Sequence, residues 1–315
     1  MTALVEIRVP TYRRPAWLRH ALTTIVEQSL RDWRALVFDD SPDREGESVV
    51  RELADPRIEY HWNERSLGAT GNLNRAFQTE AYVGARYACV VEDDNWLLPG
   101  YLEENVAAIR ASGCAILHRN QQIWSRFEDP PVATSRTTLG DWYQSGRLRP
   151  AELRAYTLMF PGISNGALFW STDARSDLVV DDAIMDASLQ EFCRALQIVE
   201  DSFFVADCNL VWADVPLTKA RRPYYSSREF GRFLQHLRRQ VIAQHGPRLL
   251  AEAEAIAERR GELEVLERNV FNALVFEKKR RTLSLPSFLA AVGRAGMKHL
   301  VVKNPAPWYR VPLVA

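Results

Sequence analysis

Adjacent carboxylates directly after an apolar run are the residues of this chain best suited to chemistry. Residues 87–91 are apolar, and the polar residues 92–95 that follow contain Asp93 and Asp94. Carboxylate oxygens are hard ligands that suit Mg²⁺ or Mn²⁺, cations that keep coordination positions open for phosphate oxygens. The pattern therefore indicates a metal site at the end of a strand.

A second acidic pair has the same context. Asp39 and Asp40 follow the apolar run 35–38. In open α/β sheets, ligands bind just beyond the carboxyl ends of the strands. Two acidic strand ends in the first third of the chain therefore predict one metal-dependent site for a phosphorylated ligand. An alternative is that Asp39 and Asp40 only begin a turn or cap a helix.

Short β patterns alternate with helical patterns through the first hundred residues. We expect strands at residues 4–9, 35–38, 58–62 and 87–91, with helices from Pro15, near 47–53, from Thr70 and after Pro99. Repeated strand–helix alternation implies parallel pairing with right-handed crossovers. The fold class is therefore α/β, with a Rossmann-like, mostly parallel sheet flanked by helices.

The rest of the chain is less regular and then becomes helical. Short strands are expected at 114–117, 166–170 and 210–213, a weak helical pattern at 139–156, and a helix through 188–196. From residue 227 onward, apolar and charged residues interleave at helical spacing. We therefore expect a core domain at residues 1–226 and a helical extension at residues 227–315.

The composition narrows the classes of partner. The 40 basic and 40 acidic residues balance, so no general attraction to nucleic acid is expected. The four cysteines are widely spaced and predict no zinc site. With no leader and no apolar stretch of about 20 residues, we expect a cytoplasmic protein. The basic run 278–281 indicates a solvated helix end or peripheral contact with anionic lipid at the inner face of a membrane. The C-terminal helices could also form a homodimer.

Four motifs occur in a familiar order. They are Pro10-Thr11-Tyr12-Arg13-Arg14-Pro15, Asp39-Asp40-Ser41, the stretch from Asn63 to Gly68 with Asn72, and Glu92-Asp93-Asp94-Asn95 followed by Leu98-Pro99. Together they resemble the inverting family 2 glycosyltransferases of the GT-A fold over residues 4–225. Each motif is weak alone, but four in order at strand ends are a strong signal.

The resemblance implies a role for each motif. The nucleotide-sugar contacts would come from Pro10, Thr11, Tyr12, Asp39, Asp40, Arg65, Asn72, Asp93 and Arg222. Asp39 would read the base by accepting from the N3–H of uracil or thymine, and Asp40 would lie nearer the ribose. Asp94 would coordinate Mn²⁺ or Mg²⁺, with Asp93 beside it. Arg222 belongs to a basic segment that would close over the diphosphate.

Inverting transfer also needs a carboxylate that removes the proton of the acceptor hydroxyl. The resemblance implies an acidic pair that starts a helix in the second half of the chain. Asp201 fits as the base and Glu200 as its neighbour. Asp181, Asp182 and Asp186 are the rival candidates.

The sequence therefore predicts a metal-dependent, inverting glycosyltransferase that uses a UDP- or dTDP-sugar. The acceptor would be a saccharide, a lipid-linked glycan or a small metabolite, and Trp96 is a candidate platform for a sugar ring. The alternative is a nucleotide-sugar-binding protein of the same fold without turnover. A haloacid-dehalogenase phosphatase would need DxDxT, and Phe38-Asp39-Asp40-Ser41 lacks that spacing. A dinucleotide-binding dehydrogenase would need GxGxxG after the first strand, where that pattern is missing.

Overall fold

The computed structural model describes residues 3–125, 131–160, 162–214 and 227–275. Contacts divide these residues into two compact units. The first unit contains the described residues among 1–148, 163–185 and 198–222. The second unit contains the described residues among 149–162, 186–197 and 223–315. The predicted boundary at residue 226 lies outside the described residues and stays a prediction.

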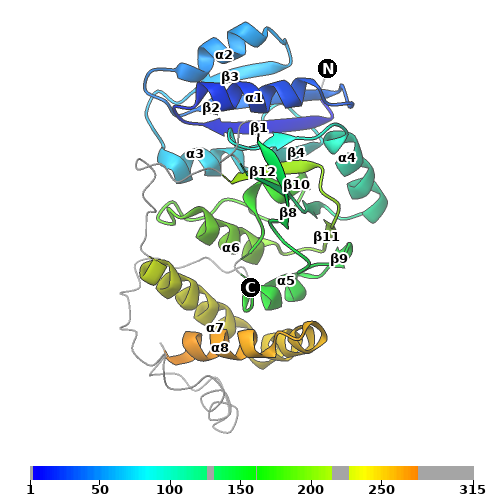
Figure 1. The fold of residues 1–315 in the computed structure, drawn as a ribbon, viewed down its shortest axis with the longest axis vertical. Helices are drawn as coiled ribbons and strands as arrows, with labels where there is room; N and C mark the ends of the chain where they lie inside the picture. Colours follow the sequence, from blue (N-terminus) through cyan, green and yellow to red (C-terminus); the bar gives the residue numbers. More distant parts are fainter. Residues whose placement is uncertain (1–2, 126–130, 161, 215–226, 276–315) are drawn as a thin grey trace. The chain divides into compact units, whose positions relative to one another are not determined.

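The first unit is built on an eight-stranded sheet with the order β3-β2-β1-β4-β10-β6-β11-β9 (Figure 1). Its strands are β1 (Val5–Thr11), β2 (Trp33–Asp39), β3 (Ile58–Trp62), β4 (Tyr87–Val90), β6 (Ile116–Arg119), β9 (Gly146–Leu148), β10 (Leu168–Ser171) and β11 (Ser202–Val205). All pairings are parallel except those of β10 and β9. The predicted α/β class with a mostly parallel sheet is confirmed.

Helices cover both faces of this sheet. They are α1 (Pro15–Val26), α2 (Glu45–Leu53), α3 (Gly68–Ala76) and α4 (Tyr101–Ser112). Strand residues alternate between the two faces. Val5, Ile7 and Val9 of β1 share one buried core with apolar residues of α1, α2 and α4. The intervening residues of β1 point to the face that α3 covers.

A buried ion pair on β1 fixes the end of α3. The Arg8 guanidinium donates to Glu6 Oε1 at 2.6 Å and to the carbonyl oxygens of Ala76, Gln78 and Glu80. Both charged side chains are fully buried. The helix end leaves carbonyl groups without helical partners, and the guanidinium satisfies them. These hydrogen bonds offset the free energy lost when the two charges are removed from water. The ion pair therefore stabilises one arrangement of α3 on the sheet.

A second sheet in the first unit has the order β5-β12-β7-β8. Its strands are β5 (Trp96–Leu97), β7 (Gln122–Ser125), β8 (Val132–Thr137) and β12 (Leu210–Asp214). Trp96 is 6% exposed and packs edge-on against Trp124 and His20. The expectation that Trp96 is an exposed sugar platform is therefore wrong, because its ring belongs to a core.

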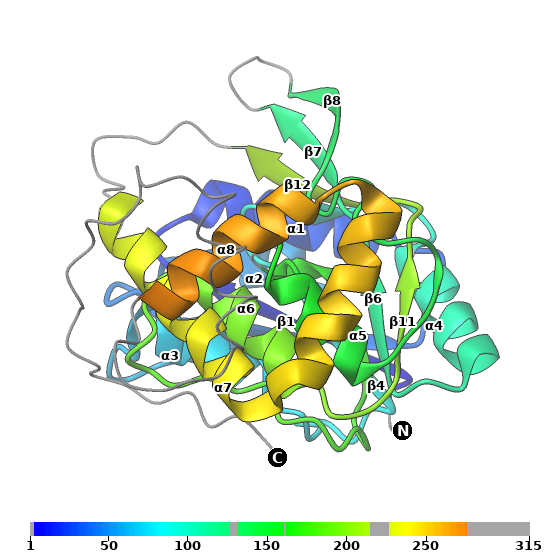
Figure 2. The same cartoon turned by 90° about the horizontal axis from the view of Figure 1, so that it is seen from below.

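The second unit is helical. It contains α5 (Pro150–Thr157), α6 (Ala187–Gln197), α7 (Ser227–Arg260) and α8 (Leu263–Val275). Figure 2 shows that α7 changes direction along its length, and the break lies at Gly246, whose φ is 61°, just before Pro247. Arg238 of α7 is buried and donates to the Thr157 carbonyl of α5, while Asn269 of α8 donates to the Leu158 carbonyl. The predicted C-terminal helices are confirmed as far as residue 275.

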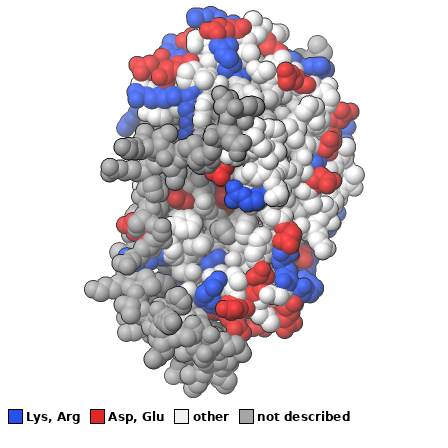
Figure 3. Space-filling model, in the orientation of Figure 1, with Lys and Arg blue, Asp and Glu red and all other residues white. Residues whose placement is uncertain are grey.

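Two surface properties bear on function. None of the helices formed by the described residues combines the length and apolar character that crossing a membrane requires. On the face seen in Figure 3, basic and acidic side chains lie close to one another in several places, with uncharged surface between them, which agrees with the balanced composition.

Candidate functional site

Three of the predicted site residues meet at the carboxyl edge of the parallel strands. Thr11 ends β1 and is level with Asp39, which ends β2. Asp93 comes three residues after the end of β4, the other neighbour of β1. The strand order therefore brings motifs from separate parts of the sequence to one edge of the sheet, as predicted.

Asp93 is the centre of this arrangement. Its Oδ2 accepts from the Thr11 hydroxyl at 2.8 Å and from the Tyr12 amide at 3.4 Å. Its Oδ1 accepts from Nη1 of Arg14 at 2.8 Å, and the same nitrogen donates to Oδ2 of Asp94 at 2.9 Å. One guanidinium nitrogen therefore bridges two adjacent carboxylates.

The electrostatics of this cluster follow from burial and charge. Burial raises the pKa of Asp93 to about 6, with Asp94 adding to the rise, while Arg14 and Thr11 oppose it. Burial alone would lower the pKa of Arg14, but the charges of Asp93 and Asp94 raise it overall. The Arg14 side chain is 31% exposed, and those of Asp93 and Asp94 are 5% and 13% exposed. The two acids thus hold excess negative charge at the rim of the sheet.

Asp39 is buried and acts as a local organiser of the backbone. Its carboxylate accepts from the amides of Ser41 and Gly46 and from the Tyr60 hydroxyl, all within 2.9 Å. The Gly46 amide belongs to the first turn of α2, so Asp39 satisfies a donor at that helix start. Burial and this contact with Asp39 raise the pKa of Tyr60 well above its usual value. Three hydrogen bonds leave one acceptor position of this carboxylate, so the predicted base contact stays a prediction.

The carboxylate of Asp40 also accepts several hydrogen bonds. It accepts from the side chains of Asn63 and Ser66 and from the amides of Leu67 and Gly68, at 2.8 to 3.0 Å. These donors hold the loop that starts α3 against the end of β2. Asp40 is 3% exposed, so its predicted ribose contact is not open at the surface of this structure.

Four other predicted nucleotide residues lie around the same edge. Asn72 is buried and donates to the carbonyl oxygens of Phe38 and Thr11, which joins α3 to the strand ends. Tyr12 is 50% exposed. Pro10 lies on β1, and Arg65 is exposed in the loop before α3. Arg222 lies outside the described residues.

The donor set of Asp93 and Asp94 fits a hard divalent cation. Two carboxylate oxygens face one point, and a positive nitrogen already lies 2.8 and 2.9 Å from them. Glu92 turns instead toward Asn95, whose side-chain amide donates to it at 3.0 Å. Among the described residues no group of three or more His, Cys, Asp or Glu side chains could hold a metal ion. A cation here would therefore complete its shell with phosphate and water oxygens.

The structure does not bring Asp201 and Glu200 to this edge. Asp201 precedes β11, a strand rather than the expected helix, and is level with Tyr87 at the start of β4. The four residues of β4 alone span about 13 Å, and three strand spacings add about 14 Å sideways. We therefore do not retain Asp201 as the base.

The local contacts of both acids are structural. Asp201 pairs with Arg147 at 3.2 Å on the surface. Glu200 accepts from the amides of Arg175 and Ser176, so it fixes a turn at the amino edge of the sheet.

Two of the rival acids, Asp181 and Asp182, lie in a segment of the first unit that is attached to α3. Thr70 lies two residues after Gly68, where α3 starts, and its hydroxyl donates to the Ile184 carbonyl at 3.0 Å. Asn74 donates to the Val180 carbonyl and to Asp182 Oδ1, both at 2.7 Å. The start of α3 lies at the carboxyl edge beside Asp40, so residues 180–184 approach the same edge.

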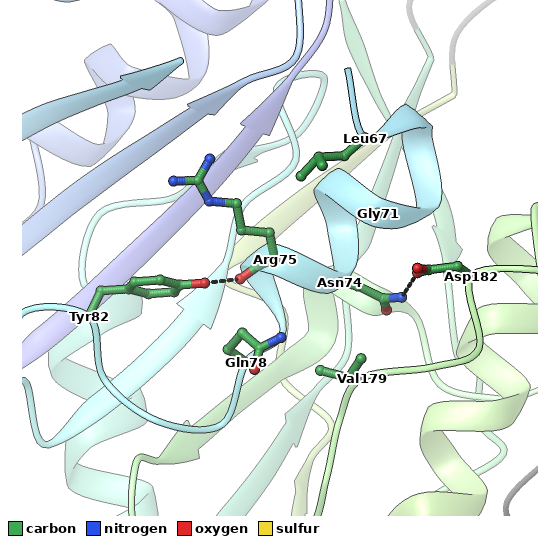
Figure 4. A pocket seen from close by; sticks show the side chains of 8 residues that line it. All are labelled: Leu67, Gly71, Asn74, Arg75, Gln78, Tyr82, Val179 and Asp182. Carbon is green, nitrogen blue, oxygen red and sulfur yellow. Dashed lines mark hydrogen bonds between the residues drawn. The ribbon is translucent and has the colours of Figure 1, made fainter. Parts of the chain in front are cut away.

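A shallow pocket of about 300 Å³ with polar and apolar lining lies along α3 (Figure 4). It is lined by Leu67, Gly71, Asn74, Arg75, Gln78, Tyr82, Val179 and Asp182. Figure 4 shows the Arg75 side chain pointing away from Asn74 and Asp182, while the Tyr82 hydroxyl donates to the Arg75 carbonyl. Asp93 and Asp94 do not line this pocket, so it is separate from the acid cluster.

Comparison with known proteins identifies the family. The model of "Glycosyl transferase family 2" matches residues 6–166, which are 161 of the 315 residues. The chain belongs to glycosyl transferase family 2. The predicted resemblance and the predicted enzyme class are thereby confirmed.

Two curated relatives of this family 2 chain are glucosyltransferases. One is the UDP-Glc:alpha-D-GlcNAc-diphosphoundecaprenol beta-1,3-glucosyltransferase WfgD of Escherichia coli, 25% identical over 120 residues, which are 38% of this chain and 46% of the relative. The other is the GalNAc(5)-diNAcBac-PP-undecaprenol beta-1,3-glucosyltransferase of Campylobacter jejuni subsp. jejuni serotype O:2, 31% identical over 101 residues, which are 31% and 32% of the two chains. The chain thus matches less than half the length of each.

Solved structures support the fold. TarS residues 1–349 from S. aureus, in complex with UDP-GlcNAc, has a TM-score of 0.56 at 14% identity, over 92% of this chain and 79% of that chain. The same protein in complex with UDP has a TM-score of 0.55 at 14% identity, over 86% and 80%. The predicted GT-A architecture with a C-terminal helical region is confirmed.

Sequence reasoning missed Arg14 as a member of the family 2 site. It lies in the first motif, but its partners are 79 and 80 positions away in the sequence. The signal in the sequence is a basic residue shortly after a strand whose end is predicted to lie near the acids. It indicates an ion pair only when β1 and β4 are neighbours in the sheet, as they are in the structure.

Proposed function

We propose that this family 2 glycosyltransferase moves a sugar from a UDP- or dTDP-linked donor to a hydroxyl group of a lipid-linked saccharide. The observation that carries the proposal is the cluster of Thr11, Arg14, Asp93 and Asp94 at the carboxyl edge of the sheet. The donor class is supported by the names of relatives and neighbours that contain UDP-Glc, UDP-GlcNAc or UDP. The acceptor class is supported by the undecaprenol-linked substrates in both relatives' names.

The donor would lie over the strand ends. Asp93 and Asp94 would hold Mn²⁺ or Mg²⁺, which when bound neutralises charge on the departing diphosphate. Tyr12, half exposed beside Thr11, offers an aromatic face to the base. Asp39 and Asp40 would shape the floor of the site through the loops that they hold, and their direct contacts with base and ribose stay proposals. Arg65 and Arg222 stay proposed contacts of the nucleotide and the diphosphate.

The general base would come from residues 181–186, which precede α6. This segment contains Asp181, Asp182 and Asp186, and it matches the expected acidic start of a helix better than Asp201 does. In the single displacement, the acceptor oxygen forms a bond to the anomeric carbon as the bond to the diphosphate oxygen breaks. The acceptor proton passes to the carboxylate, and the configuration inverts.

A donor and acceptor screen tests the proposal. UDP-glucose, UDP-N-acetylglucosamine, UDP-galactose and dTDP-glucose would be offered with Mn²⁺ and a synthetic polyprenyl-diphosphate-linked N-acetylglucosamine, and the product analysed by mass spectrometry. We expect one UDP- or dTDP-sugar to raise the melting temperature and to be transferred. Stabilisation by a donor without transfer to lipid-linked, free saccharide or small-metabolite acceptors would favour the non-catalytic binding protein.

Asparagine variants identify the base. Replacing the base among Asp181, Asp182 and Asp186 should lower transfer at least about 100-fold, the usual range for a positioned general base, while donor binding persists. The matched control is Asp201→Asn, which we expect to retain transfer within about twofold. Strong loss in the control with none in the other three would restore Asp201.

The C-terminal region would serve attachment or assembly. The basic run 278–281 lies outside the described residues, and its four positive charges would favour an anionic membrane in which a lipid-linked acceptor resides. A homodimer through the C-terminal helices is the other proposal. Co-sedimentation with phosphatidylglycerol vesicles and light scattering separate the two.

A further inference from the structure

Arg14 occupies the position between the two acids that a metal would use. We infer that Arg14 and the divalent cation exclude each other on Asp93 and Asp94, so that Arg14 leaves the carboxylates when metal and donor diphosphate bind. The inference rests on the proposed function and concerns the protein before the donor arrives. It makes Arg14 a positioning residue that couples metal binding to donor binding.

The geometry leaves one place for two cations. A single nitrogen, Nη1 of Arg14, lies 2.8 Å from Asp93 Oδ1 and 2.9 Å from Asp94 Oδ2. Mg²⁺ and Mn²⁺ need carboxylate oxygens at about 2.0–2.2 Å. A cation bridging the same two oxygens would therefore fall almost on Nη1. Steric overlap and repulsion between like charges both require the guanidinium to move.

The surroundings allow that movement without dismantling the site. The opposite oxygen of Asp93 is held by Thr11 and the Tyr12 amide, so this carboxylate keeps its orientation when Arg14 departs. The Arg14 backbone is anchored, because its carbonyl accepts from the amides of Trp17 and Leu18 at the start of α1. The side chain is nearly one-third exposed, and the guanidinium lies 5.5 Å from the centre of the Trp17 ring. Movement of Arg14 is thus a change of side-chain rotamer.

A diphosphate supplies the new partner for the guanidinium. Phosphate oxygens bind arginine in a bidentate geometry that matches the planar group. Metal and diphosphate would therefore arrive as a pair, with Arg14 passing from carboxylate to phosphate oxygens. Because such coupling is reciprocal, the metal should bind weakly to the protein alone and more tightly once the nucleotide is present.

Mn²⁺ binding measured by electron paramagnetic resonance tests this, because free Mn²⁺ is counted directly and no turnover is needed. In the absence of nucleotide, Arg14→Gln should bind Mn²⁺ roughly tenfold more tightly than the wild type, since one nearby positive charge is lost. Arg14→Lys keeps the charge and should stay within about threefold of the wild type. Arg19→Gln is the matched control on α1, where the arginine pairs with Glu52 rather than with the cluster, and should leave the affinity unchanged.

The second measurement adds UDP. The gain in Mn²⁺ affinity that UDP produces should be smaller in Arg14→Gln than in the wild type, and the variant should bind UDP more weakly in the presence of Mn²⁺. Equal Mn²⁺ affinity in folded wild type and Arg14→Gln would overturn the inference while leaving the proposed function intact. Failure of the wild type to transfer any donor sugar with saturating Mn²⁺ would instead overturn the proposed function, whatever Arg14 does.

Discussion

A buried histidine should make the first unit sensitive to acid. His118 lies on β6 in the middle of the eight-stranded sheet, between Leu168 of β10 and Phe204 of β11. It is fully buried, and neither ring nitrogen has a hydrogen-bond partner among the described residues. Burial lowers its pKa to about 3, because the charged ring would be desolvated.

The magnitude follows from proton linkage. In the unfolded chain the ring titrates near its ordinary pKa of about 6.5, so below that pH the unfolded state binds a proton that the folded state refuses. The stability contributed by the neutral His118 ring is therefore fully present above pH 6.5 and is lost as the pH falls toward 3. At pH 4.5 the loss is about 2.7 kcal/mol.

The substitution His118→Leu removes the pH-dependent contribution of the ring to stability while keeping the side-chain volume nearly constant. Urea unfolding followed by tryptophan fluorescence at pH 7.5, 6.5, 5.5 and 4.5 would give the free energy of unfolding of both proteins. We expect the variant to gain about 2.7 kcal/mol on the wild type between pH 7.5 and pH 4.5. At pH 7.5 the variant should be equal or more stable, because an unpaired polar ring no longer has to be buried.

The control is His61→Leu on β3 of the same unit. Burial also lowers the pKa of His61, but its side chain is 38% exposed, so the pH-dependent gain should be much smaller. Parallel pH profiles for wild type and His118→Leu would refute the reasoning, because they would show that the buried ring is protonated or solvated in the folded protein.

Three further outcomes follow from the packing. Arg8→Met should lower the free energy of unfolding by about 3–5 kcal/mol in urea titrations, because Glu6 would be left as an unpaired buried charge. Gly46→Ala should cost about 1–3 kcal/mol in the same assay, since the new Cβ would lie 2.8 Å from Asp39 Oδ2, and an unchanged midpoint would contradict that contact. Asp201→Asn should leave the melting temperature within a few degrees, as the side chain makes an exposed ion pair.

The sequence was sufficient for the elements with strong periodicity. The strand expected at residues 58–62 is β3 itself, and the strands expected at residues 35–38 and 87–91 match β2 and β4 within two residues. Buried parallel strands are runs of apolar residues, so local composition identifies them. The convergence of Thr11, Asp39 and Asp93 at one edge followed from the alternation of strands and helices.

The elements that were missed lack such a pattern. β8 is largely exposed and polar, and its sequence predicts no strand at residues 132–137. β11 has only four residues, and the acids before it predict a helix start, because acids are also typical of the first turn of a helix. That misassignment hid the position of the predicted base, Asp201, at the amino edge of the sheet and away from Asp93 and Asp94. Register and strand order decide the edge, and they depend on pairing over a long sequence distance.

The two acid pairs at the carboxyl edge differ in the kind of partner they have. Asp40 accepts hydrogen bonds from two backbone amides and two short side chains. These donors cannot move away from Asp40 without unfolding the start of α3. Asp94 accepts from Arg14, whose side chain is 31% exposed. Only the second kind of partner can be exchanged for a ligand at low cost. The two pairs should therefore respond differently to the same substitution.

Asparagine at each position separates structure from binding. Asp40→Asn should lower the free energy of unfolding by about 2–4 kcal/mol, because a buried amide group would face amide donors. Asp94→Asn should stay within about 1 kcal/mol of the wild type, because the lost pairing with Arg14 is offset by relief of repulsion against Asp93. Mn²⁺ binding should show the reverse order, with loss in Asp94→Asn and retention in folded Asp40→Asn. If Asp94→Asn destabilised the protein as strongly as Asp40→Asn, both pairs would be structural, and the exchangeable cation site would have no basis.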